Sequence, residues 1–155
     1  MKKIIIPLAF LFTIAACNNN SEGTLSDDSK KPKTQTDSLM ADVMDGHDVG
    51  MGKMSKISKM QNEITRVLDS IAKLPAKAKK AVAPYKAKLD SLKADLAYAE
   101  MAMDKWMTEF NMDSAVNNVQ ERIKYLTDEK VKVGKVKEAI LNSLQKADSL
   151  LKSKF

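Results

Sequence analysis

The feature that most constrains the fold is a run of apolar residues between positions 85 and 110, spaced alternately four and three residues apart. This run, here called the heptad seam, is typical of a long helix that packs against other helices along its whole length. Pro84 suits the first turn of that helix, where amide hydrogens have no partner within the helix. A start at Pro75 with a kink at Pro84 is the alternative, since residues 76–83 are rich in Ala and Lys. The seam consists of Tyr85, Leu89, Leu92, Leu96, Ala99, Met103, Trp106 and Phe110.

A second helix is predicted before the seam. It begins at Thr36 or Asp37, either of which can cap it, and it ends at Leu74. It ends there because the residue before a proline, here Pro75, is disfavoured in helical geometry. Its apolar stripe is Met40, Met44, His47, Met51, Met54, Ile57, Ile64, Leu68 and Ile71.

A third helix is predicted after the seam, with Asp113 as its cap. Lys130 and Lys137 stand where apolar residues are due, and Gly134 lies between them, so this is the predicted weak part of the helix. The apolar stripe consists of Val116, Val119, Ile123, Leu126, Val133, Val136, Ile140, Leu144, Ala147 and Leu151.

These three helices predict an all-α fold. Aromatic residues are few, only one of the five glycines lies after residue 52, and no strand-like alternation is present. Helices joined by short connections run antiparallel. Residues 37–155 are therefore predicted to form an antiparallel, up-down-up three-helix bundle, with a dimeric coiled coil as the alternative packing and a homo-oligomer as one outcome.

The first sixteen residues are typical of a signal peptide. Lys2 and Lys3 precede an uncharged segment over residues 4–16, which is too short to span a bilayer because about 20 apolar residues are needed. The segment ends Ile14-Ala15-Ala16-Cys17, which resembles the lipobox of bacterial lipoproteins. The resemblance implies removal of residues 1–16, acylation of Cys17 and a stable membrane anchor. Since Cys17 is the only cysteine, no disulfide framework is expected.

Residues 17–36 hold one large apolar residue, Leu25, and are predicted to form a flexible tether. Its root-mean-square reach would be roughly 25 Å. Asn18 lacks the charge of the aspartate that retains many lipoproteins in the inner membrane, so the cell envelope and its outer membrane are the expected location. An exported chain with only a small excess of basic side chains has little opportunity to meet nucleic acid, and no such partner is expected.

The methionines lie in two windows of the sequence. All ten except Met1 lie within residues 40–60 or 101–112, and antiparallel packing would bring both windows to the tethered end. Thioether and imidazole ligands suit Cu(I), a soft ion. The candidate ligands for Cu(I) or Ag(I) are His47, Met44, Met51, Met54, Met103 and Met107.

The same residues have other interpretations. Methionine is an adaptable core filler, so the stripe fits an ordinary core that needs no cofactor. A His/Met pair could also ligate haem, without covalent attachment. Gly46, Gly50 and Gly52 indicate a frayed turn, the close approach of a partner or ligand, or a helix that starts near Lys53.

A basic segment surrounds the predicted turn between the first two helices, at the end remote from the tether. It is a candidate surface for another envelope protein or a cell-wall polymer, and the alternative is an ordinary solvated face. Its members are Lys73, Lys77, Lys79, Lys80, Lys86, Lys88 and Lys93.

Little in the sequence supports catalysis. The chain has one histidine, no thiol left free after lipidation and no glycine-rich nucleotide loop. We therefore expect a structural or interaction role and no enzymatic activity, with soft-metal binding as the alternative.

One family resemblance rests on the motif Met44-x-x-His47-Asp48-x-x-Met51-x-Lys53-Met54, followed by Met103-Asp104-x-Trp106-Met107 and a Lys-rich C-terminal helix. Together they resemble uncharacterised Bacteroidetes lipoproteins labelled "viral A-type inclusion protein". Members tend to have Glu-Val where Val49-Gly50 stands here. The resemblance implies a helical envelope lipoprotein and no mechanism.

Overall fold

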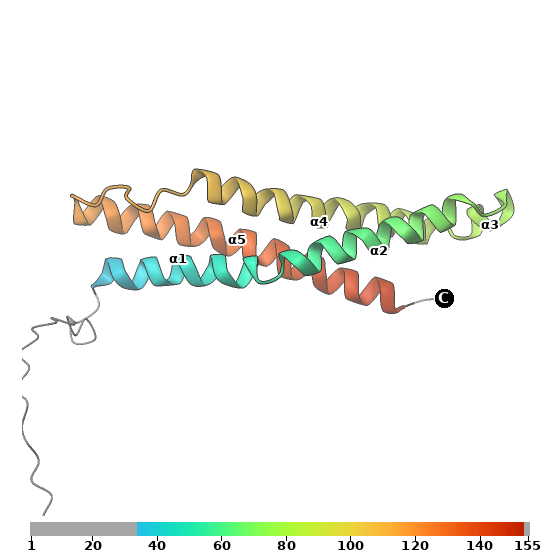
Figure 1. Cartoon of the computed structure of the whole chain (residues 1–155), viewed down its shortest axis with the longest axis horizontal. Coiled ribbons are helices and arrows are strands. Elements are labelled where there is room, and N and C mark those ends of the chain that lie inside the picture. The colour runs from blue at the N-terminus through green and yellow to red at the C-terminus, as the bar shows by residue number, and fades with distance from the viewer. Residues whose placement is uncertain (1–33, 154–155) are drawn as a thin grey trace, which may run out of the picture. The chain divides into compact units, whose positions relative to one another are not determined.

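The computed structural model describes residues 34–153, and this part of the chain is all-α, as predicted (Figure 1). The predicted signal peptide, Cys17, the predicted tether up to residue 33 and residues 154–155 lie outside the described residues. The helices are α1 (Gln35–Met51), α2 (Met54–Ala72), α3 (Ala76–Ala81), α4 (Ala83–Glu109) and α5 (Val119–Lys152).

Contacts between side chains give the direction of each helix. Asp42 of α1 accepts a hydrogen bond from Lys130 of α5, and Lys56 of α2 donates one to Asp148, further along α5. The first segment of the bundle, α1 followed by α2, is therefore parallel to α5. The ion pair between Lys56 and Asp148 spans 2.5 Å and holds the pKa of that carboxyl below its usual range, chiefly through the hydrogen bond.

The fourth helix runs in the opposite direction. Trp106, near the end of α4, contacts Glu129 in the first half of α5, whereas Asp95 contacts Lys146 near the end of α5. The order is thus up, down and up, and the bundle predicted from the three stripes is confirmed (Figure 1).

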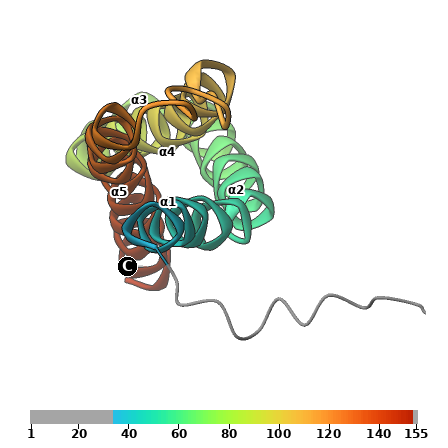
Figure 2. The same cartoon turned by 90° about the vertical axis from the view of Figure 1, so that its left-hand side faces the viewer.

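The first segment is not the single helix that the sequence predicted. It is interrupted at Gly52 and Lys53, where the amide hydrogens bond back to Asp48 and Gly50. The interruption lets the two parts choose different neighbours, since α1 packs mainly on α5 and α2 mainly on α4. Viewed along the bundle, α2 is displaced to one side of α1 (Figure 2).

The buried face of α1 also differs from the predicted stripe. Its buried residues are Val43, Gly46 and Gly50, one position away from Met44, His47 and Met51. A Cβ on Gly46 would lie only 2.9 Å from a methyl group of Val133, so this face is built of glycine because α5 approaches closely. Gly46 and Gly50 therefore mark a close approach, whereas Gly52 lies in the break, after which α2 starts at Met54.

The start of α1 is two residues earlier than predicted. Thr34 is the cap: its hydroxyl accepts a hydrogen bond from the amide of Asp37, whose carboxylate accepts one from the amide of Thr34. This reciprocal pair satisfies two amide groups at the helix start. The bundle thus begins before Asp37, and Thr36 lies within the helix.

Most of the predicted core of α2 and α4 is confirmed, although Leu68, Tyr85 and Phe110 are only partly buried. Ile57, Ile64 and Ile71 of α2 are buried, and six members of the heptad seam form the buried face of α4. The Ala- and Lys-rich stretch after Pro75 is a separate short helix, α3. The six buried seam residues are Leu89, Leu92, Leu96, Ala99, Met103 and Trp106.

The third helix begins later than predicted. Residues 112–117 form turns, and Asn118 caps α5 by accepting hydrogen bonds from the amides of Gln120 and Glu121. Asp113 is therefore not the cap. Val116 and Val119 do not belong to the buried stripe, because more than half of each residue is exposed.

The helix α5 is continuous through its predicted weak part. The core position between Leu126 and Val133 is occupied by Glu129, while Lys130 points to Asp42. A Cβ at Gly134 would meet nothing within 4 Å, so the packing of α5 does not require a glycine at this position.

Candidate functional site

The structure brings α1 and α4 together at His47 and Trp106. Their ring centroids lie 5.7 Å apart, with the ring planes tilted by 39°. Gly50, one turn further along α1, leaves room for the end of the Met103 side chain. Residues from both methionine windows therefore lie in the same part of the bundle.

The five methionines proposed as ligands lie in different environments. Met103 is completely buried in the core. Met51 and Met107 are 39% and 37% exposed. Met44 and Met54 are intermediate, and Met54 lies beyond the break between the first two helices and packs against the core. The candidate ligands of the first segment therefore do not share one helix face as predicted, because the helix is interrupted between Met51 and Met54.

The imidazole of His47 is 21% exposed and is already engaged. Its Nδ1 lies 2.9 Å from a carboxylate oxygen of Asp48. Among residues 34–153, no group of three or more His, Cys, Asp or Glu residues could hold a metal ion. That criterion does not include methionine sulfur, so binding of Cu(I) or Ag(I) by thioether ligands stays a prediction.

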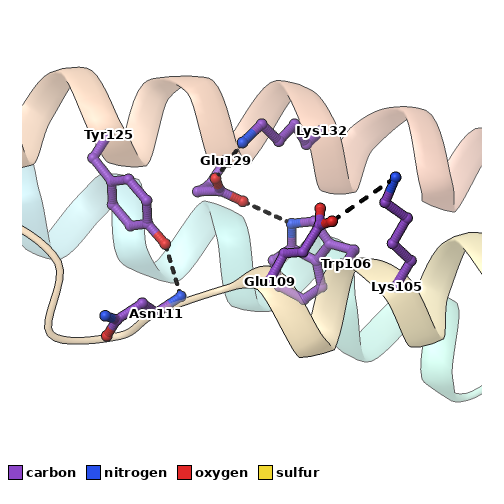
Figure 3. Close-up of polar contacts among 7 residues, drawn as sticks. All are labelled: Lys105, Trp106, Glu109, Asn111, Tyr125, Glu129 and Lys132. Carbon is purple, nitrogen blue, oxygen red and sulfur yellow. Dashed lines mark hydrogen bonds and ion pairs between the residues drawn. The ribbon is translucent and has the colours of Figure 1, made fainter.

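The polar centre of the bundle is Glu129, which the sequence analysis did not single out. This residue is 4% exposed. Its carboxylate accepts a 2.9 Å hydrogen bond from Nε1 of Trp106 and a 2.7 Å one from Nζ of Lys132 (Figure 3). The available signal was its spacing, three residues after Leu126 and four before Val133, which is a core position on the heptad pattern.

The pair formed by Glu129 and Lys132 joins the core to the surface. The Lys132 side chain is mostly exposed, at 60%, whereas that of Glu129 is 5% exposed. The hydrogen bond from Lys132, followed by the negative charge of Glu129, raises the pKa of the lysine above its ordinary value. Lys132 therefore stays protonated to a higher pH than an unpaired lysine would.

An aromatic stack closes the core at this end. Trp106 and Phe110 are stacked with centroids 4.8 Å apart, and Phe110 and Tyr125 follow at 6.2 Å. The Tyr125 hydroxyl accepts a hydrogen bond from the amide of Asn111, which Figure 3 also shows. Every buried side-chain nitrogen and oxygen in the described part of the chain has a partner. Such a saturated cluster stabilises the fold and offers no free group for chemistry.

The lysine-rich segment has a different character. Residues 73–88, here called the basic tip, join α2, α3 and the start of α4, and contain six lysines and no acidic residue. One of these lysines, Lys86, forms an ion pair with Asp90. The others form no ion pair within the described residues, and the side chains of all six lie at the surface. They are Lys73, Lys77, Lys79, Lys80, Lys86 and Lys88.

Negative charge is concentrated in α1, at the end of the first segment opposite to the basic tip. Helix α1 contains four aspartates and no lysine or arginine. The basic tip and α1 lie at opposite ends of the bundle (Figure 1). The described part of the chain is thus electrostatically asymmetric along its length.

A surface hollow of about 810 Å³ runs along α2. It contains the apolar side chains of Val67, Ile71 and Leu74 beside charged residues such as Arg66 and Glu63. The residues that line it belong to α2, except Leu74, which follows the end of that helix. It is a surface groove without convergent catalytic groups.

Two further observations bear on function. Between residues 34 and 153, no helix has both the length and the apolar character needed to cross a membrane. No protein-family model, curated protein or solved structure matches the chain.

Proposed function

We propose that this chain is a lipid-anchored protein of the cell envelope, held by Cys17, whose basic tip binds an anionic cell-wall polymer without catalysing a reaction. The observation that carries the proposal is the set of six exposed lysines on residues 73–88, five of which form no ion pair within the described residues. The lipobox motif ending in Cys17 supports the anchor.

The chemistry of the tip suits a repeating anion. A lysine ammonium is a compact point charge that binds carboxylate or phosphate without strict geometry. Because each exposed ion pair contributes little by itself, several lysines on one short segment are needed for useful affinity. The short helix α3 places Lys77, Lys79 and Lys80 within four residues of one another.

The geometry of the bundle supports the same role. The chain enters α1 at Thr34, and the basic tip lies at the far end of α2 (Figure 1). At 1.5 Å per residue, α1 and α2 together extend on the order of 55 Å. A bundle anchored through the residues before Thr34 could therefore hold its cationic end well away from the membrane.

The test uses the full chain, purified from the membrane fraction in detergent, and insoluble cell wall freed of protein. We expect the chain to sediment with the wall, and Lys77→Glu, Lys79→Glu and Lys80→Glu together to reduce the bound fraction by tenfold or more, consistent with several lost charge contacts of about 0.5 kcal/mol each and new repulsion.

The matched control reverses three exposed lysines outside the tip, Lys59, Lys124 and Lys135, and should bind like the native chain. Equal loss in both variants would indicate a response to net charge alone and contradict the proposal. A Cys17→Ser chain should be absent from the membrane fraction, and its retention there would contradict the anchor. Capture of a protein in place of the polymer would point to an envelope protein partner.

A further inference from the structure

The connection between α4 and α5, together with the first residue of α5, exposes several apolar side chains. Met112 is 57% exposed, Val116 56% and Val119 64%. They lie within eight residues of one another and are among the most exposed large apolar residues of the described chain. Apolar side chains gathered in this way commonly mark a contact surface.

The backbone of this connection is firmly held. The carbonyl of Ser114 accepts a 2.7 Å hydrogen bond from Arg122, and the amide of Asp113 donates to the side chain of Asn111. Ala115 has φ of 56°, in the left-handed region that residues other than glycine rarely adopt. A conformation of this kind costs free energy and persists where the surroundings impose it. The apolar side chains are thus displayed by an ordered turn.

The turn lies at the end of the bundle where the chain enters. Helices α1 and α5 are parallel and in register, as the contacts of Asp42 with Lys130 and of Gly46 with Val133 show. The start of α5, and the turn before it, therefore lie at the same end as Thr34 (Figure 1).

We propose that residues 112–119 rest on the bilayer that holds the lipid anchor, with Met112, Val116 and Val119 in contact with the boundary between headgroups and acyl chains. The inference rests on the proposed function, since the bilayer is adjacent only if Cys17 is lipidated. The predicted tether, with a reach of roughly 25 Å, is shorter than α5, which extends about 50 Å. The end that carries Thr34 is thus the end held near the membrane.

The charges at this end favour an uncharged or zwitterionic surface. The four aspartates of α1 would be repelled by anionic headgroups. The contact is therefore apolar in nature, and it should persist in zwitterionic lipid and at high salt.

The experiment uses the full lipidated chain in phosphatidylcholine vesicles. Because acylation occupies the thiol of Cys17, a new cysteine can be labelled alone. An environment-sensitive fluorophore is attached through Asn117→Cys in the turn or, as a matched control, through Asn142→Cys, which is also an exposed position, on α5. Lipids that carry a quencher in the acyl chain then report contact. We expect quenching at position 117 to exceed that at position 142 at least about twofold, and to persist in 1 M salt.

A second variant identifies the groups responsible. Val116→Asp with Val119→Asp, added to the labelled Asn117→Cys chain, should reduce quenching to the level of position 142. Both valines are more than half exposed, so the fold should survive, which circular dichroism checks. Equal quenching at the two label positions would overturn the inference. A label shielded from aqueous iodide yet not reached by the lipid quencher would also overturn it, because a protein would then cover the turn.

Flotation of the vesicles separates this inference from the function on which it rests. If the chain fails to float, the anchor is wrong and both fail. If it floats without quenching at position 117, the anchor stands and only the contact of the turn is wrong.

Discussion

At the scale of single residues, the stability of the core depends on how the buried carboxylate of Glu129 is hydrogen-bonded. A buried carboxylate is costly unless its oxygens are paired, and here Trp106 and Lys132 supply the two partners. The indole N–H of Trp106 in turn donates its hydrogen bond to Glu129. The carboxylate of Glu129 and the indole N–H of Trp106 are therefore each buried with a hydrogen-bond partner, which avoids the free-energy cost of burying an unpaired polar group.

Removing the acceptor should destabilise the bundle. We predict that Glu129→Ala lowers the free energy of unfolding by about 1–3 kcal/mol, because the buried indole N–H is left unpaired. Glu129→Gln should lose less, since an amide oxygen can still accept from Trp106. Urea denaturation of the full chain, followed by circular dichroism, measures both. Equal losses would show that the charge of Glu129, and not its hydrogen bond, stabilises the core.

At this scale the sequence is least informative. The heptad spacing allows position 129 as a core position, but a charged residue there carries no apolar signal. The sequence pattern therefore predicts the interruption of the stripe at Lys130, whereas the buried residue is Glu129. The cap at Thr34 was similarly hidden, because Thr34, Thr36 and Asp37 can all cap a helix and only the hydrogen bonds distinguish them.

At the scale of the helices, the interruption at Gly52 and Lys53 organises the packing. It lets the first segment pass from α5 to α4. Before the break, Gly46 lies against Val133 of α5, and Gly50 lies against Met103 of α4 and Ile140 of α5. Val133, which faces Gly46, is branched at Cβ and completely surrounded, so it cannot move aside easily.

Two glycine substitutions should therefore have opposite effects. Gly134→Ala is predicted to stabilise the chain by about 0.5–1 kcal/mol, since alanine favours a helix and a Cβ there meets nothing. Gly46→Ala gains the same propensity but forces Val133 to shift, and should be destabilising by about 1 kcal/mol overall. Thermal unfolding of both variants compares them. Stabilisation by both would mean that α1 does not approach α5 closely.

The difference between α4 and α1 shows what apolar spacing can predict. The heptad seam of α4 is large and regular, so hydrophobicity alone identified its buried face. The buried face of α1 consists of small residues because side chains of α4 and α5 occupy the space beside it. Glycine has no side chain, so it gives no hydrophobic pattern in the sequence. The methionines beside it gave the stronger pattern, which shifted the predicted stripe and the candidate metal site with it.

At the scale of the whole bundle, the charges are separated along the long axis. The aspartates of α1 lie at the end where the chain enters, and the lysines of residues 73–88 lie at the other end. Their sequence positions could be read directly, but their placement at opposite ends depended on the antiparallel order of the helices. That order was predicted from the short connections and is confirmed by the contacts between helices.

The central claim is that the basic tip meets the cell wall while the chain is anchored in a membrane. Its most direct test is photo-crosslinking in intact cells, with a photoreactive amino acid replacing Ala81 in the tip or Asn142 on α5, both exposed. We predict that the full chain with the substitution at Ala81 is recovered covalently attached to wall material that contains amino sugars, and that the substitution at Asn142 gives little or none. Equal attachment at both positions, or attachment at position 81 to proteins alone, would contradict the claim.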